Sequence, residues 1–414
     1  MGSAPVNTVQ DIAERYVKLV LAIGRHDAAY VDAYYGPPEW QAEALGERRD
    51  LAAIGRDIND ARARLSQQSP ALAEEARRID FLDKQLRAMR ARVDMLGGTV
   101  FSFDEETDRL YDAVAPHHAR AHYAQLVERI DALLPGPGSV SARVNAFRAG
   151  LAIPPAKLRS VMDAAIQAGR ERTLQFIDLP EGEHFQLEFV GDKPWSGYNW
   201  YKGNYQSVIQ INTDLPIYID RAVDLGCHEG YPGHHVYNVL IEQDLVRGKQ
   251  WPEYSVYPLF SPQSLIAEGT ANYGIELSFS DEERLAFEQQ VLYPLAGLDA
   301  GLAQRYAQLN ALLTQLSYAD NDAAMQYLSG ALTPQQTMEW LIEVRLYPAE
   351  KAAQRLQFYD ALRGYVINYN LGQDMARDYI LRQATAPEPA RAKAQRWAAF
   401  RDLMASPRPP SALR

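Results

Sequence analysis

Residues 224–236 constrain the fold most, because they place three of the eight histidines in a helix that cannot be regular. Apolar residues at helical spacing flank these histidines and predict an amphipathic helix. Pro232 has no N–H to donate, and Gly233 is the most permissive residue. This pair is therefore expected to open or bulge the helix between His228 and His234.

The interruption decides which histidines can share a metal ion. A zinc-binding helix commonly carries His-Glu-x-x-His, whose histidines lie four residues apart on one face. Here Pro232 stands four residues after His228. On a straight helix, His234 would lie on another face and His235 nearly two turns away. If the Pro-Gly pair absorbs two extra residues, His234 returns to the position of the second ligand, so it is favoured over His235.

A third ligand is predicted in a second apolar helix, over residues 265–277. Glu268 lies within this apolar pattern, and a buried acid needs a partner, which a metal ion would supply. Gly269, Ala271 and Gly274 are small, as expected where this helix packs closely against the histidine helix.

These two segments resemble the bacterial family called domain of unknown function 885. The shared pattern is His-Glu-x-x-Pro-Gly-His-His followed by Glu-Gly-x-Ala-x-Tyr. The matching positions are His228, Glu229, Pro232, Gly233, His234, His235, Glu268, Gly269, Ala271 and Tyr273. In related oligopeptidases a glycine directly precedes the second histidine ligand, and Gly233 stands directly before His234.

That family is grouped with His-Glu-x-x-His zinc metallopeptidases whose third ligand is a glutamate. The resemblance implies one zinc ion per chain, held by His228, His234 and Glu268. Zinc lowers the pKa of a coordinated water towards about 7, and Glu229 would accept its proton as general base. The expected reaction is hydrolysis of a peptide bond in a short peptide.

The remaining pattern predicts a mainly α (α+β) fold in one large unit. Helical periodicity dominates residues 1–180, the N-terminal helical half, and returns in a catalytic half at 181–405. Strand-like residues at 185–190 and 200–211, with a Gly203-Asn204 turn, predict a small antiparallel sheet beside the zinc helix. We expect a metallopeptidase-like fold with a cleft, and a frayed tail over 406–414.

An edge strand of this sheet could pair with an extended peptide and align it over the metal. Tyr198, Trp200, Asn204 and Tyr205 are the candidate contacts. The alternative is that these residues only cover the inner face of the sheet.

A donor to the oxyanion is also required. The candidates are His235, Arg345, Tyr347 and Tyr359, and Arg345 is also a candidate substrate contact. Related enzymes often use a tyrosine after the third ligand, which favours Tyr347. The residues after Tyr347 nevertheless depart from the Pro-Gly-Gln-Ala of the family.

An acid close to the metal should orient one histidine ligand through its second ring nitrogen. Asp224 lies one turn before His228, and Glu276 lies two turns after Glu268, so either could do so. Tyr273, which ends the second motif, is expected near the same ligands.

Composition and charge exclude several classes of protein. The net charge of −11 without a long basic run argues against nucleic-acid binding, and no apolar stretch is long enough for a membrane span. Cys227 is the single cysteine, so an internal disulfide is excluded. We expect it to be a buried residue and not a metal ligand. The sequence leaves the compartment open: it is cytoplasmic, or it is periplasmic or secreted if residues 1–5 replace a removed signal peptide.

Three other readings stay open at this point. The chain could be a helical binding or scaffold protein with a structural or relic metal site. It could instead hydrolyse non-peptide amides or esters, which the same metal chemistry serves. A second metal at His118 and His122 is disfavoured, because their four-residue spacing has no carboxylate-rich partner. The position of cleavage along a peptide is not predicted.

Overall fold

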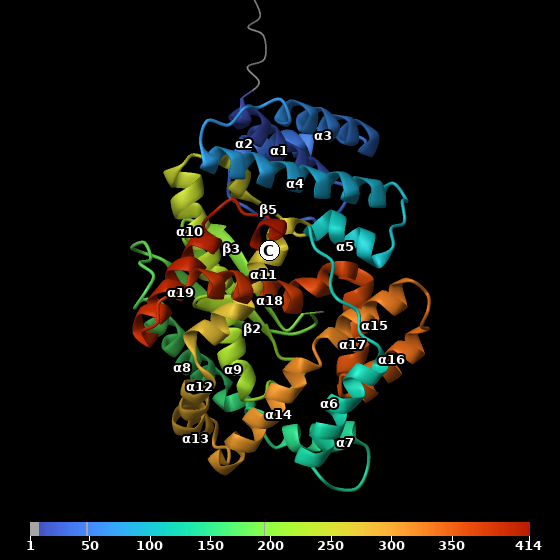
Figure 1. Cartoon of the computed structure of the whole chain (residues 1–414), viewed down its shortest axis with the longest axis vertical. Coiled ribbons are helices and arrows are strands. Elements are labelled where there is room, and N and C mark those ends of the chain that lie inside the picture. Colours follow the sequence, from blue (N-terminus) through green and yellow to red (C-terminus); the bar gives the residue numbers. More distant parts are fainter. Residues whose placement is uncertain (1–7, 47–48, 194) are drawn as a thin grey trace, which may run out of the picture.

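The computed structural model describes residues 8–46, 49–193 and 195–414. Helices make up most of this part of the chain, and two small sheets complete it (Figure 1). The prediction of a mainly α fold with a small β component is confirmed. Residues 1–5, read above as the possible replacement of a signal peptide, lie outside the described part. No described helix is long and apolar enough to cross a membrane.

The N-terminal residues form a helical layer at the top of Figure 1. Its members are α1 (Val9–Ile23), α2 (Pro38–Gly46), α3 (Leu51–Leu65) and α4 (Ala73–Leu96). The first helix begins at a capping box in which Thr8 and Asp11 satisfy each other's backbone N–H groups. Four helices follow, α5 (Phe103–Tyr111), α6 (Arg120–Leu133), α7 (Val140–Ala149) and α8 (Pro155–Thr173).

The N-terminal half also contains a strand that the sequence pattern did not reveal. Strand β1 (Val31–Tyr34) pairs antiparallel with β5 (Val256–Pro258). Four residues are too few to show a period of two, so this strand is an exception within the N-terminal half that the sequence predicts to be mainly helical. The two halves expected from the sequence therefore share a sheet.

The second sheet is mixed, which corrects the expected antiparallel arrangement. Its strands are β2 (His184–Val190), β3 (Gly197–Gly203) and β4 (Gln206–Asn212), in the order β2-β4-β3. The β3–β4 hairpin is antiparallel, whereas β2 runs parallel to β4. Strand β4 lies between β2 and β3. Since β3 runs opposite to both of the other strands, the neighbours β2 and β4 are parallel.

The helices that carry the two motifs lie at the centre of the molecule. They are α9 (Asp220–Leu225), η1 (Gly226–Gly230), α10 (His234–Leu240), η2 (Ile241–Gly248) and α11 (Pro262–Ser278). Helix α18 (Ile367–Gln383) crosses α11 with backbones almost touching, since a Cβ on Gly269 would lie 2.3 Å from the Gly372 carbonyl oxygen. The small residues were predicted to pack against the histidine helix; Gly274 does lie against Pro232, where a Cβ would come within 2.9 Å of the ring, but Gly269 packs against α18 instead.

Further helices surround this centre, mostly in the lower part of Figure 1. They are α12 (Asp281–Phe287), η4 (Glu288–Leu292), α13 (Tyr293–Ala296), α14 (Ala303–Gln315), α15 (Tyr318–Leu328), α16 (Pro334–Glu343), α17 (Ala349–Leu362) and α19 (Pro389–Met404).

The C-terminal tail is packed and not frayed, so the prediction for residues 406–414 is wrong. Residues Pro410–Leu413 form a short 3-10 helix, and Leu413 is only 2% exposed. The Ser411 N–H donates to the Asp112 carboxylate at 2.9 Å. Burial of Leu413 keeps residues 406–414 packed, although their proline-rich sequence is typical of a loop.

Candidate metal centre

A π-helix and a three-residue break set the directions of the motif histidines. Helix α9 continues into η1, which is a π-helix, and the chain then leaves helical geometry until α10 begins at His234. The Gly233 N–H donates to the Cys227 carbonyl at 2.9 Å. A Cβ on Gly233 would lie 1.9 Å from the His228 carbonyl oxygen, so only glycine fits here. The interruption predicted from Pro232-Gly233 is present.

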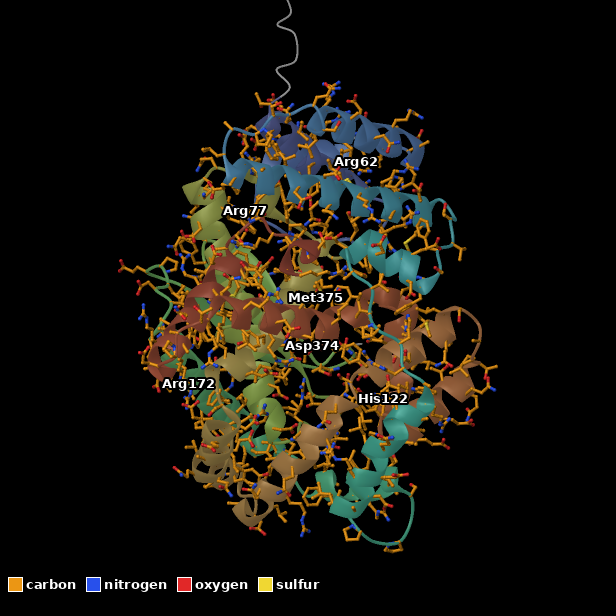
Figure 2. The ribbon with its side chains drawn as sticks, in the orientation of Figure 1. Arg62, Arg77, His122, Arg172, Asp374 and Met375 are labelled. Atoms are coloured by element: carbon orange, nitrogen blue, oxygen red, sulfur yellow. The ribbon has the colours of Figure 1, made fainter. Side chains whose placement is uncertain are left out.

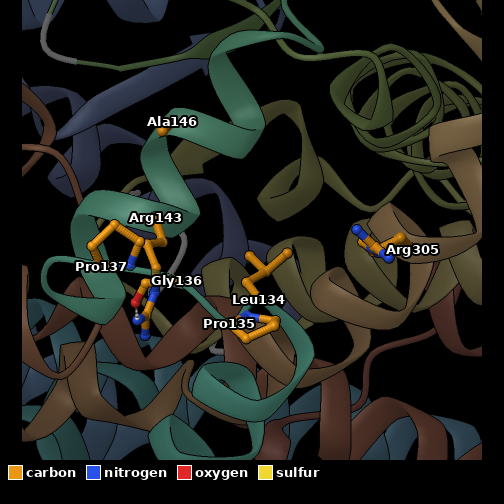
Figure 3. A pocket seen from close by; sticks show the side chains of 7 residues that line it. All are labelled: Leu134, Pro135, Gly136, Pro137, Arg143, Ala146 and Arg305. Carbon is orange, nitrogen blue, oxygen red and sulfur yellow. Dashed lines mark hydrogen bonds between the residues drawn. The ribbon is translucent and has the colours of Figure 1, made fainter.

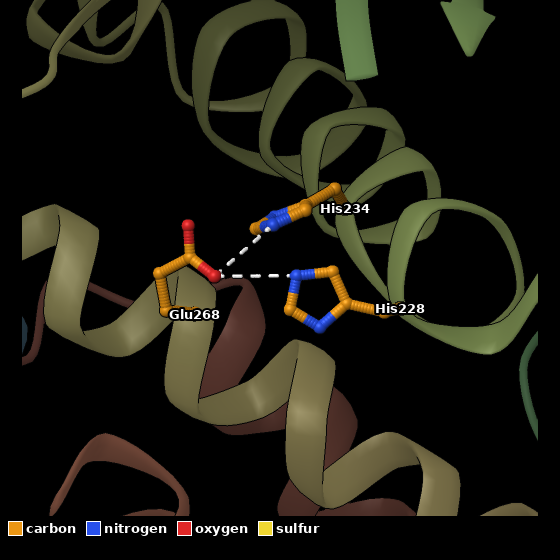
Figure 4. A group of neighbouring side chains, drawn as sticks. All are labelled: His228, His234 and Glu268. Atoms are coloured by element: carbon orange, nitrogen blue, oxygen red, sulfur yellow. Dashed lines mark ion pairs between the residues drawn. The ribbon is translucent and has the colours of Figure 1, made fainter. Parts of the chain in front are cut away.

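The break brings His228, His234 and Glu268 together (Figure 4). Glu268 Oε2 lies 3.2 Å from His228 Nε2 and 3.6 Å from His234 Nε2. Tetrahedral zinc with bonds of about 2.0–2.2 Å separates its ligand atoms by roughly 3.3 Å, so the spacing fits such an ion. Within the described ranges, this is the group of histidine, cysteine and acidic side chains that could hold a metal.

The ring of His228 is oriented by Asn272, which sequence reasoning missed. His228 Nδ1 lies 2.9 Å from Asn272 Oδ1, and Asn272 Nδ2 donates to the Tyr369 carbonyl at 2.9 Å. The asparagine oxygen can only accept, so Nδ1 carries a proton, and Nε2 is the ring nitrogen turned towards Glu268. Asn272 follows Glu268 by four residues on α11, a spacing that could have identified it.

Glu268 presents one oxygen to the histidines and anchors the other. Its Oε1 accepts a hydrogen bond from the Tyr365 hydroxyl at 2.8 Å, whereas its buried Oε2 has no hydrogen-bond partner. Burial alone would raise the pKa of Glu268, but His234 and His228 outweigh it and hold that pKa well below its usual value. A buried, ionised oxygen without a hydrogen-bond donor is suited to a cation.

Glu229 lies beside this cluster and is 5% exposed. A Cβ on Gly197 would come within 2.7 Å of Glu229 Oε1, so the carboxylate lies against the first residue of β3. Asn199 on the same strand donates to the Glu229 carbonyl at 2.9 Å. Burial raises the pKa of Glu229, and the two cluster histidines partly oppose this.

A further carboxylate, Asp32, reaches the same region from β1. Tyr198, a predicted substrate contact, donates its hydroxyl to Asp32. Burial, together with the negative charges of Glu268 and Glu229, raises the pKa of Asp32 to about 7. Asp32 is almost 200 residues away from the motif in sequence, so only the β1–β5 pairing places it here.

His235 does not face the cluster, which corrects its predicted role at the oxyanion. Its Nδ1 lies 2.8 Å from Ser207 Oγ and its Nε2 lies 2.9 Å from Glu183 Oε2. The ring is fully buried, and both of its nitrogens are engaged on the sheet side of α10. His234 therefore remains the second candidate ligand.

Asn204 and Tyr205 were predicted to contact substrate, but their observed contacts stabilise the β3–β4 turn. Both occupy the β3–β4 turn, and their backbone N–H groups donate to the Glu242 carboxylate at 3.1 and 3.3 Å. Arg247 closes this arrangement by bonding to Asn204 Oδ1 and lying over the Tyr205 ring. Left-handed φ angles at the two residues demand these anchors.

The three residues predicted near the histidine ligands lie elsewhere. Asp224 forms ion pairs with Arg221 and Arg284 at 3.1 and 2.9 Å. Glu276 bonds to Gln373 and Arg377 on α18, and Tyr273 packs its ring near Phe400. None of these contacts reaches a cluster histidine, because helical spacing alone did not show which face each acid presents. Asn272 has the role proposed for them.

Arg345, Tyr347 and Tyr359 converge on one carboxylate, that of Asp320. Arg345 Nε and the Tyr347 hydroxyl lie 3.0 and 2.9 Å from Asp320 Oδ2. The Tyr359 hydroxyl donates to Oδ1 at 2.9 Å. The two tyrosine hydroxyls are thus already committed as donors, so neither is free to stabilise an oxyanion in this arrangement.

Other sites of interest lie away from the cluster. A surface pocket of about 330 Å³ (Figure 3) is lined by Leu134, Pro135, Gly136, Pro137, Arg143, Ala146 and Arg305. It shares no residue with the cluster. The exposed His122, near the start of α6 (Figure 2), stacks its ring on His118 at 4.4 Å. The cleft predicted between two helical halves stays a prediction.

If the cluster holds zinc, replacing Asn272 with alanine should weaken the binding by about 10- to 100-fold, because the His228 ring loses its orienting partner. The measurement is competition for zinc against a chromophoric chelator. Asn310→Ala, on α14, is the matched control and should bind zinc as the wild type does. Unchanged affinity in Asn272→Ala would contradict the role assigned to this asparagine.

Comparisons with known proteins inform the fold. No protein-family model and no curated protein matches the chain. A solved structure from Colwellia psychrerythraea, described as a "putative lipoprotein", is 14% identical with a TM-score of 0.53, covering 99% of this chain and 76% of its own. BsuCP is 12% identical, with a TM-score of 0.49 and 94% and 88% coverage. The Colwellia protein shows that this fold occurs elsewhere.

Proposed function

We propose that the chain is a zinc-dependent peptidase that hydrolyses peptide bonds of short peptides. The observation that carries this proposal is the convergence of His228 Nε2, His234 Nε2 and Glu268 Oε2 beside the buried carboxylate of Glu229. Two imidazoles and a carboxylate with a neighbouring acid are the set required for metal-assisted hydrolysis.

The protein's own groups divide the work. When bound, zinc supplies Lewis-acid chemistry, which activates water and polarises a carbonyl. Glu229 accepts the proton of the attacking water and can return it to the leaving amine. Asn272 keeps His228 in the tautomer that presents Nε2, and Tyr365 fixes the direction of Glu268. Strand β3 passes directly by Glu229 and offers an edge along which an extended peptide could align.

The number of protein ligands favours catalysis over a structural metal. Structural zinc sites are almost always closed by four protein ligands, whereas catalytic sites use three and keep one position open. The cluster among the described residues has three members. This observation weighs against the alternative of a binding or scaffold protein with a structural ion. Hydrolysis of non-peptide amides would use the same groups.

Digestion of a mixed peptide pool tests the proposal. We expect the zinc-loaded protein to produce new peptide fragments, detected by mass spectrometry, and a chelator to abolish them. Re-addition of zinc should restore the products. A zinc-loaded protein that leaves every peptide in the pool intact would favour the scaffold alternative, and cleavage of simple amides alone would favour the non-peptide one.

A further inference from the structure

A group of partly buried cations lies near Glu229 and has too few anions to balance it. We define the cationic cluster as Arg345, Lys351 and Arg355. Arg345 Nε and Arg355 Nε each lie 3.0 Å from Asp320, which is 5% exposed. Two guanidinium groups thus share a single carboxylate, and Lys351 lies one turn before Arg355 on α17. Buried charge of one sign without a counter-ion is costly, which points to an anionic ligand.

Asp320 cannot neutralise the third cation, because its oxygens are fully used. Oδ1 accepts from Arg355 and Tyr359, and Oδ2 accepts from Arg345 and Tyr347. An ionised carboxylate has about four lone-pair positions, and all of them have donors here. The Asp320 side chain also lies between the two arginines, which compete for its charge. Lys351 must therefore find its partners elsewhere.

The contacts of Lys351 are neutral. Its ammonium lies 2.7 Å from Gln354 Oε1 and 3.5 Å from Ser196 Oγ. Among the residues that the structure describes, no carboxylate oxygen forms an ion pair with Lys351 within 4.0 Å. Because Lys351 and Arg355 are four residues apart on α17, they lie on one face of that helix.

The cationic cluster is connected to Glu229 through the start of β3. Ser196, which Lys351 contacts, directly precedes Gly197, whose Cα faces the Glu229 carboxylate. The Lys351–Ser196 contact, the Cα spacing of about 3.8 Å between Ser196 and Gly197, and the Gly197–Glu229 contact follow one another. Together they place the Lys351 ammonium within roughly 14 Å of the Glu229 carboxylate. An extended peptide advances about 3.3–3.6 Å per residue, so at most about four residues span this distance.

We propose that the cationic cluster, with Lys351 as its unpaired member, binds the terminal carboxylate of a peptide substrate. The chain would then release a short fragment, of at most about four residues, from the carboxyl end. This inference rests on the proposed peptidase function and specifies its substrate. A free carboxylate would complete the charge balance of Lys351, and Ser196 Oγ offers it a further hydrogen bond.

The pH dependence follows from the surroundings of Lys351. Burial and the positive charges of Arg355 on α17, Arg221 on α9 and Arg148 on α7 lower the pKa of Lys351 to about 7, against the opposing charge of Asp320 on α15. Below pH 7 the ammonium form prevails and attracts a carboxylate. Above pH 7 the neutral amine prevails, so preference for a free carboxyl terminus should fall as pH rises through 7.

The test compares three peptides that differ only at the carboxyl end: a free acid, its amide, and an amide whose last residue is glutamate. We expect kcat/KM for the free acid to exceed that for the plain amide by about 10- to 100-fold, as for other charge-assisted contacts. Lys351→Met should reduce the free-acid rate to the amide level and leave the amide rate unchanged. Lys157→Met, on the exposed face of α8, is the matched control and should behave as the wild type.

Two outcomes would overturn the carboxylate site. Equal rates for free acid and amide in the wild type would show that no terminal carboxylate is read. Rapid cleavage of the glutamate amide would assign the cationic cluster to an acidic side chain. If the wild type cleaves none of the peptides, the peptidase proposal fails, and calorimetric titration with the free acid and the amide then tests the carboxylate site alone. Equal affinities would reject it.

Discussion

Glu229→Gln is expected to lower peptide hydrolysis at least about a hundredfold while the protein keeps about one zinc per chain. Glutamine has nearly the same shape as glutamate, so the packing against Gly197 should survive. It cannot accept a proton at neutral pH, and the attacking water then loses its base. The measurement pairs steady-state kinetics on a peptide from the digested pool with metal analysis of the same sample.

The exposed Glu339→Gln on α16 is the matched control, because it changes the same charge far from the motif in sequence. It should keep both the wild-type rate and the wild-type zinc content. Wild-type activity in Glu229→Gln would remove this residue from the mechanism. Loss of zinc together with activity would instead make Glu229 a support of the metal site.

His234→Ala should weaken zinc binding at least about a hundredfold and remove hydrolysis with it. Loss of a residue that only orients a ligand costs about 10- to 100-fold, and loss of a ligand should cost no less. His234 Nε2 lies 3.6 Å from Glu268 Oε2, so alanine deletes one of the three converging atoms. Zinc content after dialysis and a titration against a chromophoric chelator measure the effect.

His122→Ala provides the matched control, since this histidine is exposed on α6 and its ring contacts His118 and Tyr123. It should bind zinc as the wild type does. Circular dichroism of His234→Ala should remain that of a helical protein. The Asn238 side chain donates to the backbone carbonyl of residue 234, and this bond does not depend on the imidazole. A folded His234→Ala protein that retains one tightly bound zinc would show that the ion lies elsewhere.

Sequence reasoning worked best where a local pattern had one structural solution. Pro232 and Gly233 could not continue a regular helix, and the chain leaves helical geometry at that point. The expected return of His234 to the side of His228 matches their ring centroids, which are 4.7 Å apart. The helical periodicity seen in residues 1–180 also corresponds to long amphipathic helices such as α1 and α3.

The prediction failed where a role depended on the direction of a side chain. Asp224, Glu276 and His235 all had suitable chemistry and spacing, yet each points to partners other than the cluster. The sequence shows that an acid or imidazole is present near a ligand, but the face it presents follows from packing against distant elements. The parallel β2–β4 pair was not predicted either, because the choice of neighbouring strands also depends on packing against distant elements.

The amino-acid sequence alone determined that helices dominate, that one helix breaks between two histidines, and that a second apolar helix carries an acid in need of a partner. These features follow from steric limits and hydrophobic periodicity, which act over a few residues. Tertiary structure alone decided that Asn272 orients His228, that Asp32 arrives on β1, and that Lys351 stands beside the start of β3. Those neighbours are far apart in sequence, and only burial of the whole core brings them together.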